Sequence, residues 1–199
     1  MMGNLGFWQA WVYLFVMAAA SATMVVYLQR KDPTLLRRRT RGLGAEKDAS
    51  QNVLQVLAML VLSGTFVLSW CDHRYAWSHV PLIVDIAGFA VVVLGFLIYF
   101  IVFRENTFAG ATVEVVSDQK VITTGPYARV RHPMYSGLLV LLFGTPLALG
   151  SWWGLLMVVP MALIIALRIR FEERFLTENL PGYADYCRKL RYRLIPFIW

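Results

Sequence analysis

Five stretches of apolar residues, separated by polar segments, dominate this sequence. The first three approach or exceed the about 20 residues that a membrane-spanning helix needs. The last two are shorter, and only Gly150 and Ser151 lie between them, which predicts two antiparallel helices joined by a tight turn. The five predicted transmembrane segments are residues 7–28, 52–70, 82–103, 135–149 and 152–167.

Composition places the chain among integral membrane proteins. Of its 199 residues, 58% are hydrophobic and only 16% are charged, and the mean hydropathy is +0.57. These values lie outside the range of ordinary soluble domains. The net charge of +7 does not require a nucleic-acid partner, because basic residues also mark the cytoplasmic side of membrane proteins.

The basic residues are distributed very unevenly between the predicted connections. Of the 19 lysines and arginines, only Arg74 falls on the side opposite to all the others. We therefore expect a multi-pass protein with its N-terminus outside and its C-terminus in the cytoplasm.

The charged residues 37–48 are interpreted as a solvated loop attracted to anionic lipid. Cys71 and Cys187 are expected on opposite sides, unpaired, and no Cys or His spacing indicates a metal site.

Two polar segments, residues 104–134 and 168–199, are longer than simple connections between membrane helices require. Long ordered connections often carry function. We expect the two to form a cytoplasmic cap over the last two helices. The prediction is thus one all-α membrane domain over residues 1–199, with three N-terminal helices in residues 1–103 and the candidate chemistry in residues 104–199. The oligomeric state stays open, because Gly88 and Gly95 can pack helices within or between chains.

A cluster of aromatic, cationic and imidazole groups precedes the fourth predicted helix, in the sequence GPYARVRHPMY at residues 125–135. The proline at 133 predicts that this helix begins there, because the residue before proline avoids helical dihedral angles. His132 would then lie at the helix N-terminus, beside exposed amide groups. The alternative is that these basic residues are ordinary interfacial anchors.

A second cluster, Arg168, Glu172 and Glu173, follows the fifth apolar segment, on the expected continuation of its helix. Residues four apart share a helix face, so Arg168 and Glu172 should point the same way and Glu173 elsewhere. An exposed salt bridge at a helix end is the simpler interpretation. The favoured one is that both clusters meet in a single polar cavity, since charges at the end of a membrane helix are costly unless they face one.

Together these motifs resemble the isoprenylcysteine carboxyl methyltransferase family and the wider group of membrane phospholipid methyltransferases. The resemblance covers roughly the second half of the chain, from Asn106 onward, and rests on the RHPMY motif and the later glutamate pair. It implies that residues 104–199 are a catalytic half that uses S-adenosylmethionine to methylate a lipophilic acceptor from the bilayer. The catalytic residues it implies are Arg168, Glu172 and His132, and the cofactor-binding residues are Lys120, Val121, Ile122, Tyr127, His132, Tyr135, Glu172 and Glu173.

Several alternatives remain open from the sequence alone. Which of Glu172 and Glu173 meets the cofactor is undecided, and the acceptor can be a prenylcysteine-like carboxylate, a phospholipid amine or a thiol. The C-terminal residues 182–186 and 193–196 are also similar to NADPH-dependent membrane sterol reductases. A small non-catalytic membrane subunit is the third possibility. No glycine-rich GxGxxG fingerprint is present, which argues against a soluble nucleotide-binding methyltransferase.

Overall fold

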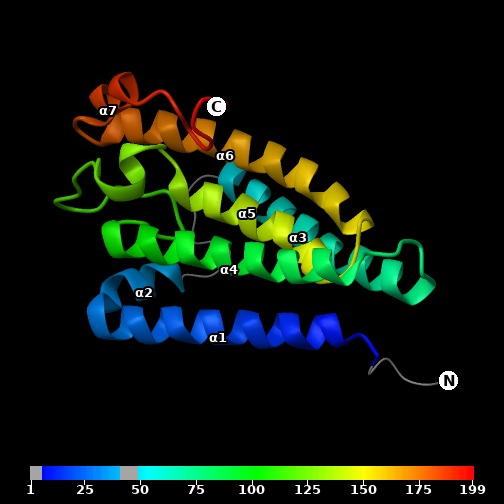
Figure 1. Cartoon of the computed structure of the whole chain (residues 1–199). Helices are drawn as coiled ribbons and strands as arrows, with labels where there is room; N and C mark the ends of the chain where they lie inside the picture. The colour runs from blue at the N-terminus through cyan, green and yellow to red at the C-terminus, as the bar shows by residue number, and fades with distance from the viewer. Residues whose placement is uncertain (1–5, 41–48) are drawn as a thin grey trace.

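The structure, a computed structural model, describes residues 6–40 and 49–199. Over these residues the chain is helical, without a β-strand (Figure 1). Its elements are α1 (Trp8–Lys31), α2 (Pro33–Arg39), α3 (Ala49–Tyr75), α4 (Leu82–Glu105), η1 (Gly125–Ala128), α5 (Pro133–Ala148), η2 (Trp153–Met157), α6 (Val158–Asn179) and α7 (Tyr183–Lys189), where η denotes a 3-10 helix.

Among the described residues, four helical segments are long and apolar enough to cross a membrane: α1, α3, α4 and the continuous η2–α6 segment. Their outward faces carry large apolar side chains such as Phe15, which is 74% exposed, and Ile83, which is 71% exposed. Such surfaces are unfavourable in water and suit lipid. The predicted all-α integral membrane protein is therefore confirmed. The fifth predicted span, α5, has 16 residues, and so is about 24 Å long against a hydrocarbon core of about 30 Å.

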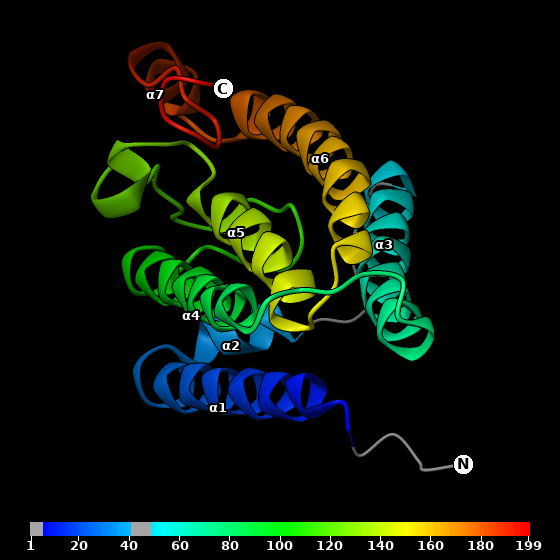
Figure 2. The same ribbon diagram turned by 45° about the vertical axis from the view of Figure 1, so that its right-hand side comes forward.

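α5 occupies the middle of the bundle. It packs most extensively against α4 on one side. α6 packs against both α5 and α3, as the turned view shows (Figure 2). Tyr135 and Leu142 from α5 join Met161, Ile165 and Ile169 from α6 in a buried apolar cluster. α2 lies across one end of the bundle, on the same side as η1 and α7 (Figure 1).

Glycines allow α4 and α5 to approach each other closely. A Cβ atom at Gly88 would lie 2.3 Å from the backbone nitrogen of Ala148, and one at Gly95 would lie 2.9 Å from that of Leu141. A Cβ atom at Gly144 on α5 would lie 2.9 Å from the backbone nitrogen of Val92. In this chain, therefore, Gly88 and Gly95 pack helices within one molecule, which is one of the two possibilities that the sequence left open.

One predicted boundary was wrong, and one helix extends beyond its apolar segment. α3 continues to Tyr75, so Asp72, His73 and Arg74 belong to its last turn, beyond the predicted end of this span at residue 70. α6 continues past the apolar segment that ends at residue 167 and reaches Asn179, so Arg168 and Glu172 lie on one helix, as their spacing predicted. Hydropathy marks where a helix leaves the apolar environment, but the polar residues that follow, such as Arg168 and Glu172, are themselves good helix formers.

A buried carboxylate joins α3 to the connection between α5 and α6. Asp72 is fully buried, and its carboxylate accepts hydrogen bonds from the backbone N–H of Ser78 at 2.8 Å and from the hydroxyls of Ser78 at 2.7 Å and Ser151 at 2.6 Å. Ser151 in turn accepts a bond from the N–H of Gly154. One acid thereby satisfies the polar groups of two connections at this end of the bundle.

Replacing Asp72 with alanine is expected to destabilise the protein by about 2–4 kcal/mol, because it leaves buried donors without an acceptor. The midpoint of thermal unfolding in detergent, measured by intrinsic fluorescence, reports the effect. Asp185→Ala is the matched control, since Asp185 lies on the exposed surface of α7 and, within the described part of the chain, pairs with Arg188 alone. Equal midpoints for the two variants would show that the Asp72 hydrogen bonds contribute little.

Candidate functional site

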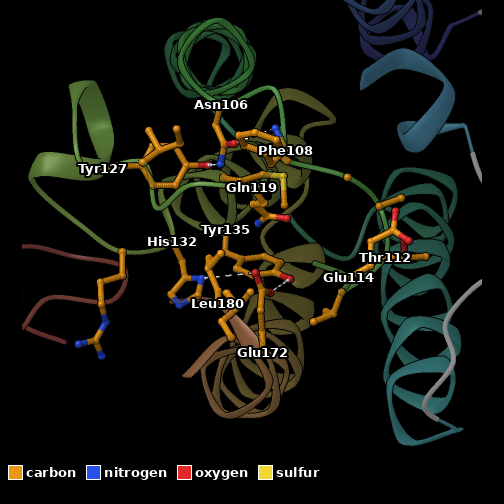
Figure 3. Close-up of a pocket in the computed structure, with 18 of the residues that line it drawn as sticks. Asn106, Phe108, Thr112, Glu114, Gln119, Tyr127, His132, Tyr135, Glu172 and Leu180 are labelled. Carbon is orange, nitrogen blue, oxygen red and sulfur yellow. Dashed lines mark hydrogen bonds and ion pairs between the residues drawn. The ribbon is translucent and has the colours of Figure 1, made fainter. Parts of the chain in front are cut away.

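A cavity of about 290 Å³ lies at the end of the bundle that carries α2, η1 and α7. Its walls come from α2, the ends of α3 and α4, the connection after α4, the start of α5, the end of α6 and α7. Figure 3 shows side chains of this wall, among them Asn106, Tyr127, Tyr135 and Glu172, around one space. Among the residues predicted from the sequence, those that line the cavity are Lys120, Val121, Ile122, Tyr127, His132, Tyr135, Arg168 and Glu172; Glu173 lies outside it.

His132 lies at the start of α5, where the sequence placed it. α5 begins at Pro133, and His132 is its N-cap residue with φ −124°, outside the helical range. The backbone N–H groups of Arg131 and His132 donate to the carbonyl oxygens of Tyr192 and Arg193, each at 2.9 Å. The C-terminal segment is therefore attached directly to the His-Pro motif.

The hydroxyl of Tyr135 connects the two polar clusters. It donates to Glu172 at 2.7 Å and accepts from Nε of Arg168 at 2.8 Å (Figure 3 shows Tyr135 beside Glu172). Arg168 also donates through Nη2 to the carbonyl oxygen of Ala111 at 3.2 Å. Arg168 and Glu172 thus point the same way, toward the cavity, and Arg168 links α6 to the long connection.

Glu173 points away from the cavity and has three basic partners. Its carboxylate lies 2.7 Å from Nε of Arg131, 2.9 Å from Nε of Arg193 and 3.2 Å from Nε2 of His132. Arg131 further donates to the carbonyl oxygens of Cys187 and Leu190. These contacts connect the start of α5, α6 and the C-terminal segment, which indicates a structural role for Glu173.

Both ring nitrogens of His132 face carboxylates. Nε2 contacts Glu173 at 3.2 Å, and Nδ1 lies 3.9 Å from the carboxylate of Glu172. A neutral ring that donates from Nε2 to Glu173 keeps its lone pair on Nδ1, toward the cavity. Glu173 can in this way orient a base in the site without entering it.

Tyr127, a residue of η1, forms another part of the cavity wall. Its hydroxyl accepts a bond from the side-chain amide of Asn106 at 2.8 Å, and its carbonyl oxygen accepts one from the hydroxyl of Tyr186 at 2.7 Å (Figure 3 shows Asn106 beside Tyr127). Burial raises the pKa of Tyr127 to about 12. The phenol is therefore neutral at physiological pH and offers an aromatic face and a hydrogen-bonding group.

Comparison with known proteins matches residues 83–181 to the family described as phospholipid methyltransferase. The match begins in α4, covers α5 and α6, and includes His132, Tyr135, Arg168 and Glu172. The chain belongs to this family. The family is part of the isoprenylcysteine carboxyl methyltransferase-like group of membrane methyltransferases, so the resemblance noted in the sequence is confirmed.

Two curated proteins are similar to part of this chain. The mouse Delta(14)-sterol reductase TM7SF2 is 27% identical over 105 residues, which are 49% of this chain and 25% of that protein. The nickel-cobalt-cadmium resistance protein NccN of Alcaligenes xylosoxydans xylosoxydans is 32% identical over 71 residues, 35% of this chain and 33% of that protein. The chain thus spans about a quarter to a third of the curated relatives it matches.

Some cavity residues of this phospholipid methyltransferase family member were not predicted. Asn106, the first residue after α4, and Arg39, the last residue of α2, both line the cavity. The interpretation of residues 37–48 as a solvated loop was wrong for residues 37–39, which are helical, and residues 41–48 lie outside the described part of the chain. A polar amide just after an apolar helix was a usable signal for Asn106. Arg39 carried no such signal among its basic neighbours.

Proposed function

We propose that this protein is an S-adenosylmethionine-dependent methyltransferase that methylates a lipophilic acceptor in the membrane. The observation that carries the proposal is the Arg168–Tyr135–Glu172 constellation, which faces a polar cavity at the end of apolar helices. It lies within the region that matches the family. A charged constellation in such a place is costly unless a ligand uses it.

The chemistry of the cavity wall suits this methyl donor, which has a sulfonium cation, ribose hydroxyls and an amino acid group. Glu172 can accept hydrogen bonds from hydroxyl or ammonium groups, and the faces of Tyr127 and Tyr135 attract cations. His132 and the chain at Lys120, Val121 and Ile122 complete the proposed cofactor site. Glu173 enters the proposal as the residue that orients His132 and Arg131.

When bound, S-adenosylmethionine supplies an electrophilic methyl group, so the protein needs no nucleophile of its own. Its residues then have to align the two reactants and exclude water. Arg168 can orient an acceptor carboxylate through two parallel hydrogen bonds, and such an acceptor needs no base. An amine or thiol acceptor would have to lose a proton, for which Nδ1 of His132 is the proposed base. A prenylcysteine-like carboxylate is the first candidate, with phospholipid amines and thiols next.

The membrane arrangement follows the charge distribution. We propose that α5 completes a set of five spans, with the N-terminus outside and the cavity on the cytoplasmic side. The C-terminal segment from α7 onward would roof the cavity as a cytoplasmic cap. Residues 104–199 would hold most of the catalytic machinery, in one domain with the three N-terminal helices.

A second candidate function is an NADPH-dependent sterol reduction. It is favoured by the similarity to the mouse Delta(14)-sterol reductase, which covers 49% of this chain. The family match and the Glu172–Tyr135 pair in the cavity favour methyl transfer instead.

Equilibrium binding to the purified protein in detergent separates the two. We expect S-adenosylmethionine to bind and NADPH not to bind, and we expect radiolabelled methyl groups to enter a prenylcysteine, a phosphatidylethanolamine or a hydrophobic thiol. Folded protein that binds NADPH but not S-adenosylmethionine would contradict the proposal and support the reductase.

A further inference from the structure

Arg39 brings a positive charge into the cavity from the half of the chain that lies outside the family match. It is the last residue of α2, and a cap and a buried side chain fix the position of this short helix. Its first turn is capped by Asp32, which accepts from the N–H of Leu35 at 2.9 Å, and Leu35 is fully buried against Leu28 and Phe103. The position of Arg39 in the cavity wall is therefore set by the packing of α2.

The guanidinium of Arg39 has no carboxylate partner among the described residues. Its hydrogen bonds start from Nη1 and go to the carbonyl oxygen of Gly110 at 2.9 Å and the sulfur of Met134 at 3.5 Å. Its other contact of note is with the ring of Phe103, whose centroid lies 5.1 Å away. A guanidinium has five N–H donors, so those on Nε and Nη2 remain for a ligand.

The surroundings of Arg39 disfavour its charge. Burial lowers its pKa, and the positive charge of Arg168 adds to this effect. Two guanidinium groups thus approach the same cavity, and for Arg39 the described residues supply no compensating acid. An uncompensated charge in a partly buried place lowers the stability of the folded protein. Residues that destabilise the empty protein in this way are typical of binding sites.

We propose that Arg39 and Arg168 together form an anion-binding site that holds an acid group of a bound ligand. The acid group has two possible sources within the proposed reaction: the carboxylate of the methyl donor's amino acid part, and a carboxylate or phosphate of the acceptor. Guanidinium groups bind either anion through paired, charge-assisted hydrogen bonds. The inference rests on the proposed methyltransferase function and adds a ligand-binding residue from the N-terminal half.

The test uses the full-length protein with Arg39→Gln, Arg39→Lys and a control, Arg37→Gln, which removes the same charge from an exposed position of α2. Binding is measured for S-adenosylmethionine and for its decarboxylated analogue. Methyl transfer is measured with N-acetyl-S-farnesylcysteine, which has a carboxylate, and with phosphatidylethanolamine, whose amine is methylated while its phosphate supplies the acid group. Loss of paired, charged hydrogen bonds should weaken the affected step by about 10- to 100-fold in Arg39→Gln, with partial recovery in Arg39→Lys and no change in Arg37→Gln.

The two sources give different results. If Arg39→Gln weakens binding of S-adenosylmethionine but not of the decarboxylated analogue, the site holds the donor carboxylate. If both donors bind normally and KM for either acid acceptor rises, the site holds the acceptor. Unchanged binding and KM in Arg39→Gln, with a wild-type protein that binds S-adenosylmethionine, would overturn the anion site and leave the proposed function intact.

Stability of the ligand-free protein gives a readout that does not depend on the donor. A residue kept for a ligand should not stabilise the empty protein, so ligand-free Arg39→Gln is expected to unfold at the same temperature as wild type or a higher one. A clear fall, with both donors weakened equally, would assign Arg39 a purely structural role and overturn the inference. This result can be read even if the wild type binds no S-adenosylmethionine, in which case the proposed function fails separately.

Discussion

Replacing Glu172 with glutamine is expected to weaken binding of S-adenosylmethionine by about 10- to 100-fold, which corresponds to the about 1.5–3 kcal/mol of a hydrogen bond to a charged group. The variant keeps the size of the side chain but removes its charge, in a cavity where Tyr135 donates to it at 2.7 Å. Methyl transfer should fall by at least as much, because the carboxylate also holds Tyr135 and, through it, Arg168 in place. Isothermal titration calorimetry and methyl incorporation measure the two effects.

Two variants on the same helix make this prediction specific. Glu178→Gln removes an exposed charge whose one ionic partner among the described residues is Arg174, and should change neither binding nor stability. Glu173→Gln should instead lower stability by about 3 kcal/mol or more, because it leaves the buried Arg131 without its acid. The protein that remains folded should bind S-adenosylmethionine better than Glu172→Gln does, because Glu173 lies outside the cavity and acts only through His132 and Arg131. If Glu173→Gln abolished binding while Glu172→Gln did not, the roles of the two acids would be reversed.

The main elements of this fold follow from simple rules of sequence. Long apolar runs predict membrane helices, and Pro133 predicted the start of α5 because the residue before proline avoids helical dihedral angles. The shared direction of Arg168 and Glu172 follows from their spacing of four residues. These features are local, so the sequence alone contains the information that determines them.

The features that were not predictable depend on tertiary packing. Neighbouring residues of a helix point about 100° apart, so only one of Glu172 and Glu173 can face the cavity. Which one does so depends on the rotation of α6, set by the packing of Ile165 and Ile169 against α5. Arg39 likewise enters the cavity because Leu35 is buried beside Phe103, a contact between residues far apart in the chain.

Among the described glycines, Gly88 is the one whose replacement with alanine is expected to destabilise the protein most. The new Cβ atom would lie 2.3 Å from the backbone nitrogen of Ala148 and 2.6 Å from the carbonyl carbon of Leu147. Backbone atoms cannot rotate away as a side chain can, so α4 and α5 must separate. Overpacking costs about 1–3 kcal/mol where side chains can adjust, and we expect at least the upper end of that range here.

Gly64→Ala supplies the matched control within another membrane helix. Its Cβ atom would meet only the flexible side chain of Met157, at 3.2 Å from the sulfur, and alanine favours a helix over glycine by about 1 kcal/mol. We expect this variant to unfold at the wild-type temperature or above it, and Gly88→Ala to unfold far lower or to aggregate on extraction. Because α5 also carries His132 and Tyr135, any Gly88→Ala protein that does fold should lose methyl transfer as well. Equal unfolding temperatures for the two variants would show that the close approach of α4 and α5 is not needed for the fold.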